Sequence, residues 1–157
     1  MSTMSHIKIE IATPEDVDSL KELTQRLVES LGQKFEPKRF DWGITRRLYD
    51  PLQRHGILIA KDEENEKTVG MIIAELRIDP FGTSEGYIKQ VFLSKDYRGQ
   101  GIGKMLLEAA LEHLKKIKVE KVKVNLKDTA EDAARVYEKM NFKKVYEVLE
   151  LNLKKES

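Results

Sequence analysis

Cysteine is absent from this chain of 157 residues, and its absence excludes several kinds of site. Without cysteine there is no disulfide, no thiolate metal site and no thiol nucleophile. Histidine is scarce as well, because His6, His55 and His113 lie far apart with no spacing typical of metal ligands. We therefore expect no metal site.

An excess of one charge sign is also missing. The chain has 28 Lys and Arg against 27 Asp and Glu, a formal net charge of +1, which gives no electrostatic case for a nucleic-acid or membrane partner. No apolar run approaches the length of a membrane span. Met1–Ile9 lacks the apolar stretch of a signal peptide. We expect a cytoplasmic protein.

Apolar residues recur with the periods of both strands and helices. Strands are predicted at Ile7–Ile11, Ile57–Lys61, Val69–Ile78, Tyr87–Leu93, Lys121–Leu126 and Val145–Leu153, and helices at Pro14–Leu31, Pro37–Tyr49, Gly101–Ile117 and Ala133–Met140. Thr13 is expected to cap the first helix, and Asp128 or Thr129 the last. Trp42 is interpreted as core, with a substrate-facing wall as the alternative. The order β-α-α-β-β-β-α-β-α-β predicts an α+β fold, a mixed and mainly antiparallel sheet flanked by helices, in a single domain over 1–157.

The segment Arg98-Gly99-Gln100-Gly101-Ile102-Gly103-Lys104 lies between a predicted strand and an amphipathic helix. No Ser, Thr, Asp or Asn stands at the start of that helix to cap its first N–H groups. Glycines let an outside group approach the backbone closely, and Arg98 and Lys104 add positive charge. Together with the helix dipole, these features favour a bound anion such as a phosphate.

The glycine pattern differs from two well-known phosphate loops. A Walker loop needs Ser or Thr after Gly-Lys, but Met105 follows Lys104; a dinucleotide fingerprint needs a third glycine where Lys104 stands. The pattern resembles the Arg/Gln-x-x-Gly-x-Gly/Ala loop of the GNAT superfamily of acetyl-CoA-dependent N-acetyltransferases, whose loop holds the pyrophosphate of coenzyme A. The resemblance covers essentially the whole chain. The seventh strand usual in the family is the least visible, so either Tyr146–Leu153 is split or that strand is missing.

The resemblance implies where acetyl-CoA, the cosubstrate, would bind. In GNAT proteins the strand before the loop bulges, splays from the strand after the next helix and pairs with the pantetheine arm. Here that strand carries Val91, whose amide would face the acetyl carbonyl as an oxyanion donor. Ala130 stands where many family members have an Asn that bonds the pantetheine arm, and Asn125, at the end of the next predicted strand, is the candidate to replace that contact. The expected cofactor-binding residues are Val91, Phe92, Leu93, Arg98, Gly99, Gln100, Gly101, Ile102, Gly103, Lys104, Asn125 and Tyr137.

The segment Ala133–Phe142 resembles the family's Ala-x-x-x-Tyr-Glu-Lys-x-Gly-Phe signature. The resemblance implies that Tyr137 is the general acid for the leaving thiolate; packing in a helix is the alternative. Asn141 replaces the usual Gly and can adopt the same left-handed conformation.

The general base is less well defined. Some protein-lysine-acetylating relatives use a Glu as base, but Tyr87 occupies the corresponding position in this sequence. Glu75 or Glu85 is the alternative base. Lys89 and Gln90 flank the transfer site and are expected on the acceptor side with the Asp79–Gly86 connection.

The sequence thus predicts direct acetyl transfer in a ternary complex to a primary amine, either a protein or peptide amine or a small amine. The alternative is a catalytically weak acyl-CoA-binding regulatory or interaction module on the same fold. Self-association into a homodimer is left open.

Overall fold

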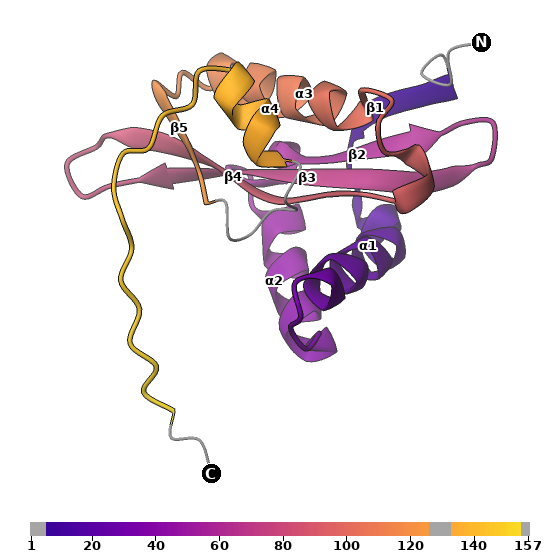
Figure 1. Ribbon diagram of the computed structural model, residues 1–157, viewed down its shortest axis with the longest axis horizontal. Helices are drawn as coiled ribbons and strands as arrows, with labels where there is room; N and C mark the ends of the chain where they lie inside the picture. Colours follow the sequence, from indigo (N-terminus) through magenta and orange to yellow (C-terminus); the bar gives the residue numbers. More distant parts are fainter. Residues whose placement is uncertain (1–5, 126–132, 155–157) are drawn as a thin grey trace.

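The computed structural model describes residues 6–125 and 133–154 and is built on a five-stranded sheet in the order β1-β2-β3-β4-β5 (Figure 1). The first four strands form an antiparallel meander, and the last joins β4 in parallel. The strands are β1 Ile7–Ile11, β2 Ile57–Asp62, β3 Lys67–Ile78, β4 Ser84–Leu93 and β5 Lys121–Val124. This mixed, mainly antiparallel sheet confirms the predicted α+β fold class.

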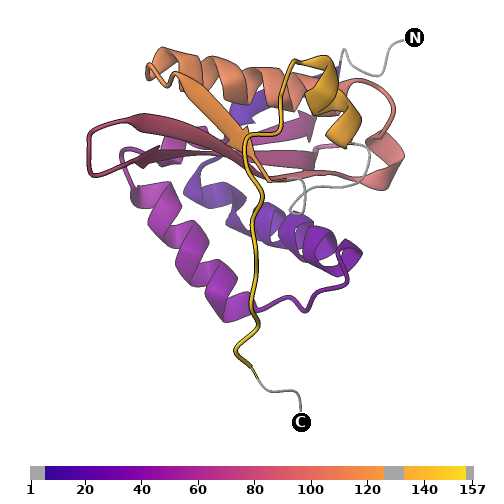
Figure 2. The ribbon, with the colours of Figure 1, turned by 60° about the vertical axis from the view of Figure 1, so that its left-hand side comes forward.

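Helices cover both faces of the sheet. Helices α1 and α2 lie on one face, and α3 and α4 lie on the other (Figures 1 and 2). The helices are α1 Val17–Ser30, α2 Pro37–Tyr49, α3 Ile102–Lys116 and α4 Ala133–Lys139, with single 3₁₀ turns η2 Pro14–Asp16, η3 Arg54–Gly56 and η4 Lys95–Tyr97. No helix of the described chain is long and apolar enough to cross a membrane.

The central strands are buried on both faces. Side chains alternate along a strand, so Ile72 packs into a core beneath α3 whereas Met71 and Ile73 pack into a second core beneath α1 and α2. The continuous apolar runs of β2 and β3 follow from this position.

Local sequence accounts for the helix ends. At the start of the first helical segment, the Thr13 N–H donates to the Asp16 carboxylate at 2.8 Å. At the end of α4, Asn141 adopts φ +69° while the Asn141 and Phe142 N–H groups bond the Glu138 and Tyr137 carbonyls. These are the two bonds of a Schellman motif, so Asn141 takes the left-handed position expected of it. The predicted caps Asp128 and Thr129 lie outside the described residues.

The C-terminal strand prediction is wrong. Residues 143–153 form no strand and run away from the sheet (Figures 1 and 2). Leu149, Leu151 and Leu153 expose 95%, 81% and 87% of their surface. Period-two alternation places apolar side chains on one face of an extended chain, but a strand also needs a neighbouring edge for its backbone bonds. Neither part of a split seventh strand is present in this segment.

The interpretation of Trp42 as core is also wrong. Its side chain is 66% exposed, and the Arg46 guanidinium stacks 4.7 Å from the ring centroid. The buried stripe of α2 instead includes Ile44 and Leu48. Trp42 is two residues from Ile44, about 200° around the helix, and therefore faces away from that stripe.

Candidate active site

The glycine loop turns the chain from β4 into α3 in a conformation that requires glycine. Gly99 and Gly101 have φ values of +77° and +88°. Gly101 is the N-cap residue of α3 and offers no side-chain cap. The first helical bond runs from the Met105 N–H to the Gly101 carbonyl at 3.1 Å. The N–H groups just before Met105 thus form the uncapped, positive end of the helix dipole.

Space is open beside two of the glycines. A Cβ atom built on Gly99 or Gly103 would meet no heavy atom within 4 Å. The Lys104 ammonium is held only at 3.8 Å by Glu108, and its side chain is 65% exposed. The residues present therefore fit a phosphate group: N–H donors at a helix start, an exposed cation and room for the ligand.

Arg98 ties the loop back to the end of β4. Its Nε donates to the Leu93 carbonyl at 2.9 Å, and its guanidinium lies 5.5 Å from the Phe92 ring centroid. Gln100 reaches back in the same way, with its Nε2 3.4 Å from the Asp96 carbonyl. Both side chains thus help to position the loop.

Strand β4 is bulged near its C-terminal end. Its pairing with β3 shifts between Ile73↔Lys89 and Met71↔Phe92, so Gln90 and Val91 stand opposite the single residue Ile72. Gln90 takes φ +51°, which few non-glycine residues adopt.

The described pairing of β4 with β5 ends close to this bulge. Their parallel pairing ends at Ile88↔Val124. Within the described part of the chain, the stretch of β4 from Lys89 to Leu93 therefore has no strand on its β5 side. The bulge implied by the family resemblance is present, and an edge without a neighbouring strand can pair with an extended ligand.

Tyr137 is buried on the α3 face of the sheet. It is 3% exposed, and its ring meets the Phe142 ring edge-on at 5.2 Å between centroids. Val91 and Leu93 pack against the same core. Burial raises the pKa of the Tyr137 phenol to about 12, so this hydroxyl keeps its proton at neutral pH.

The remaining predicted cofactor residues lie in different surroundings. Ile102 is fully buried in the core beneath α3, so the part of it that can reach a ligand is its backbone. The Phe92 side chain packs into the opposite core, beneath α1 and α2. Asn125 is exposed directly after β5.

The two candidate bases are engaged with cations on the sheet face that α2 covers. Glu75 Oε1 meets Arg77 Nε at 2.6 Å, and Glu75 Oε2 meets Arg47 Nη2 at 2.7 Å and Lys89 Nζ at 3.6 Å. Burial opposes ionisation of Glu75, but the Arg77 hydrogen bond and the Lys89 and Arg47 charges outweigh it and lower the pKa of Glu75.

Glu85 is held in a similar way. Lys123 Nζ lies 2.9 Å from Glu85 Oε1, and the Tyr87 hydroxyl donates to Glu85 Oε2 at 3.3 Å. The Lys123 bond lowers the pKa of Glu85. Both carboxylates are thus stabilised in the charged form, which weakens them as bases.

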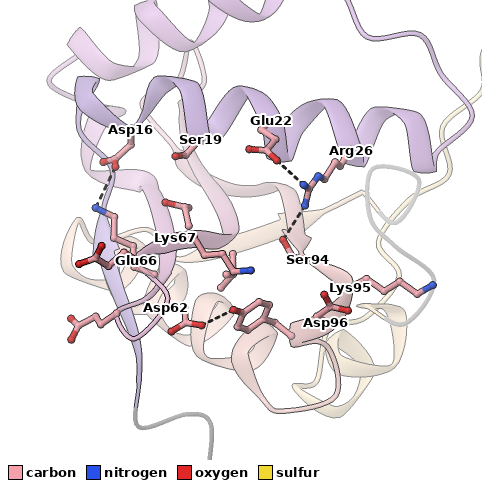
Figure 3. A pocket seen from close by; sticks show the side chains of 15 residues that line it. Asp16, Ser19, Glu22, Arg26, Asp62, Glu66, Lys67, Ser94, Lys95 and Asp96 are labelled. Atoms are coloured by element: carbon pink, nitrogen blue, oxygen red, sulfur yellow. Dashed lines mark hydrogen bonds and ion pairs between the residues drawn. The ribbon is translucent and has the colours of Figure 1, made fainter.

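A hollow of about 790 Å³ lies apart from these residues, between α1, the β2–β3 turn and η4 (Figure 3). Its side chains pair with one another. Lys61 contacts Asp16 at 3.4 Å, Arg26 contacts Glu22 at 2.6 Å, and the Tyr97 hydroxyl donates to Asp62 at 2.5 Å. None of the predicted site residues lines it, so its size alone does not make it the active site.

Comparison with known proteins decides the family. Residues 18–142 match the Acetyltransferase (GNAT) family. The chain belongs to this family. Two curated relatives are named acetyltransferases. N-alpha-acetyltransferase 30 of Schizosaccharomyces pombe is 29% identical over 79 residues, 50% of this chain. Mycothiol acetyltransferase of Propionibacterium freudenreichii is 28% identical over 94 residues, 60% of this chain. These matches span 53% and 28% of the two relatives.

The GNAT fold extends over nearly the whole chain. A structure of a predicted acetyltransferase with acetyl-CoA from Clostridium acetobutylicum superposes with a TM-score of 0.79. The two are 21% identical, and the match covers 94% of this chain and 96% of the other. At this identity the similarity shows the fold alone.

Proposed function

We propose that this GNAT protein transfers an acetyl group from acetyl-CoA to a primary amine by direct attack in a ternary complex. One observation carries the proposal: a bulged strand, with one edge unpaired among the described residues, leads through η4 into the uncapped glycine start of α3. An extended thioester arm with a diphosphate at one end fits this arrangement, because the edge offers backbone pairing and the helix start offers anion binding.

Acetyl-CoA would lie along β4 and end at the loop. The N–H groups of Gly99, Gly101, Gly103 and Lys104 would bind the diphosphate, and the freed edge from Val91 to Leu93 would pair with the pantetheine arm. Similar proteins support acetyl transfer from acetyl-CoA. One relative is named an N-alpha-acetyltransferase, and one structure with the same fold contains acetyl-CoA.

In the proposed reaction the amine nitrogen attacks the acetyl carbonyl while the Val91 N–H stabilises the developing oxyanion. A carbon–nitrogen bond forms, and the carbon–sulfur bond breaks. Tyr137 gives its phenolic proton to the departing thiolate, and a base removes the surplus proton of the amine. Glu75 or Glu85, directly or through water, is the base that we propose; of the two, Glu75 is nearer to the transfer point along the paired strands, opposite Tyr87.

The engaged state of both carboxylates favours a second candidate, an acyl-CoA-binding module with weak catalysis. Release of free thiol from acetyl-CoA over a panel of primary amines separates the two. We expect amine-dependent thiol release matched by an equal amount of N-acetylated product in mass spectrometry. Binding of acetyl-CoA without amine-dependent release would favour the module.

A further inference from the structure

We infer that the amine acceptor carries an anionic group, a carboxylate or a phosphate, which Arg47 and Lys89 bind on the α2 face of β4. The inference rests on the proposed function and specifies the class of amine that would accept the acetyl group. Glu75 is the central carboxylate on this face, and several cations surround it.

Three cations share the single charge of Glu75. Arg47, Arg77 and Lys89 all lie within 4 Å of its carboxylate, so two positive charges remain in excess. Arg47 and Lys89 are the more enclosed of the three, with side chains 27% and 29% exposed against 47% for Arg77. Excess charge in an enclosed place is more weakly screened than charge on the open surface, and it attracts an anion.

The Arg47 guanidinium has a nitrogen that the pairing with Glu75 does not use. Its Nη2 bonds Glu75, but its Nη1 is buried with no hydrogen-bond partner among the described residues. A buried donor without a partner is costly, and a carboxylate or phosphate oxygen is the acceptor that a guanidinium binds best. Lys89 is at 3.6 Å from Glu75, beyond hydrogen-bond distance, and so has donors for the same anion.

The cluster adjoins the proposed point of acetyl transfer. Lys89 precedes the bulge at Gln90 and Val91, and it pairs across the sheet with Ile73 of the core beneath α1 and α2. Gln90 Oε1 is a second buried atom with no partner among the described residues, and it can accept a bond from an amine. An acceptor with an amine and an anion would complement both unpartnered atoms.

Matched acceptors test this inference. We would compare phosphoethanolamine with ethanolamine, and β-alanine with β-alaninamide, in thiol-release assays at constant acetyl-CoA. We expect kcat/KM to be at least about tenfold higher for the anionic member of at least one pair, and the pair that responds distinguishes phosphate from carboxylate. Lys89→Gln and Arg47→Gln should reduce that ratio toward one. Arg46→Gln is the matched control, because Arg46 lies on the same helix and stacks on exposed Trp42.

Lys89→Gln keeps the Arg47–Glu75 pair, so it tests the inference even if Arg47→Gln fails to fold. Calorimetric binding of phosphoethanolamine and of β-alanine to the wild type and to Lys89→Gln adds a readout independent of turnover. Equal kcat/KM within both pairs, or a higher value for the neutral members, would overturn the inference and leave acetyl transfer intact. A different result would separate the two proposals. If Lys89→Gln weakened the binding of phosphoethanolamine or β-alanine but the wild type acetylated no amine, the anion site would be supported and the proposed function contradicted.

Discussion

Tyr137 has the surroundings that a neutral general acid requires. Its hydroxyl belongs to a buried side chain on the same core as Val91, and burial raises the pKa of this phenol to about 12. A group with that pKa holds its proton throughout the neutral range, so the phenol is present as a proton donor when the thiolate forms, although the raised pKa makes it a weaker acid.

Tyr137→Phe should therefore lower kcat by about 10²–10⁴-fold while acetyl-CoA affinity and folding change little, because the ring and its contact with Phe142 remain. Steady-state kinetics, calorimetry and thermal unfolding measure the three quantities. Tyr49→Phe, which removes a hydroxyl from a side chain 69% exposed, is the control. Undiminished kcat in Tyr137→Phe would make this residue a packing residue only.

Single residues also mark the limit of the sequence analysis. The glycine positions and Tyr137 could be named because their spacing carries the motif; their roles stay predictions. Arg47 could not, since Arg46 and Arg47 are adjacent and chemically identical in the sequence. Only the packing of α2 on the sheet shows that Arg47 reaches Glu75 whereas Arg46 stacks on Trp42.

At the scale of elements, the periodicity of apolar residues predicted most of the helices and strands that the structure contains. Helices α1, α2 and α3 follow their apolar stripes, and strands β1 to β5 follow runs that the sheet pairs on at least one side. The last predicted strand is absent because the sequence shows only its alternating pattern. Whether a sheet edge is available to pair with it depends on the tertiary arrangement.

A hydrogen bond joins the turn between β2 and β3 to η4 (Figure 3). The 3₁₀ turn η4 lies directly before the glycine loop. Asp62 accepts bonds from the Tyr97 hydroxyl at 2.5 Å and from the Asn65 side chain at 2.7 Å. These bonds, that from Tyr97 above all, lower the pKa of Asp62 from 3.8 to about 2. A lowered pKa means that the stabilisation is present above about pH 4 and is lost as the pH falls toward 2.

Asp62→Asn should accordingly lower the Tm at pH 6, and the difference from the wild type should shrink as the pH falls from 4 to 2. Thermal unfolding followed by circular dichroism over this range measures it. Glu63→Gln, an exposed carboxylate of the same turn, serves as the control. A Tm difference that stays constant down to pH 2 would contradict the assigned role of the Asp62 carboxylate.

Across the whole molecule, the sheet separates two kinds of chemistry. The α3 face carries Tyr137 and the core beside the glycine loop, and the α2 face carries the cations around Glu75. The bulge in β4 lies between them, where the acetyl group and the amine would meet. Self-association stays a prediction; the exposed apolar side chains of residues 145–153 are the surface on which we expect it to depend.

We expect the start of α3 to bind the diphosphate of acetyl-CoA. Calorimetric titration of Gly103→Leu with acetyl-CoA tests it most directly, because a side chain at Gly103 enters open space, so the fold should persist. Gly43→Leu, at a glycine of α2 with equally open surroundings, is the matched control. We predict wild-type affinity for Gly43→Leu and at least about tenfold weaker binding for Gly103→Leu, a loss of about 1.4 kcal/mol. Equal affinity in the two variants would contradict a diphosphate site at the start of α3.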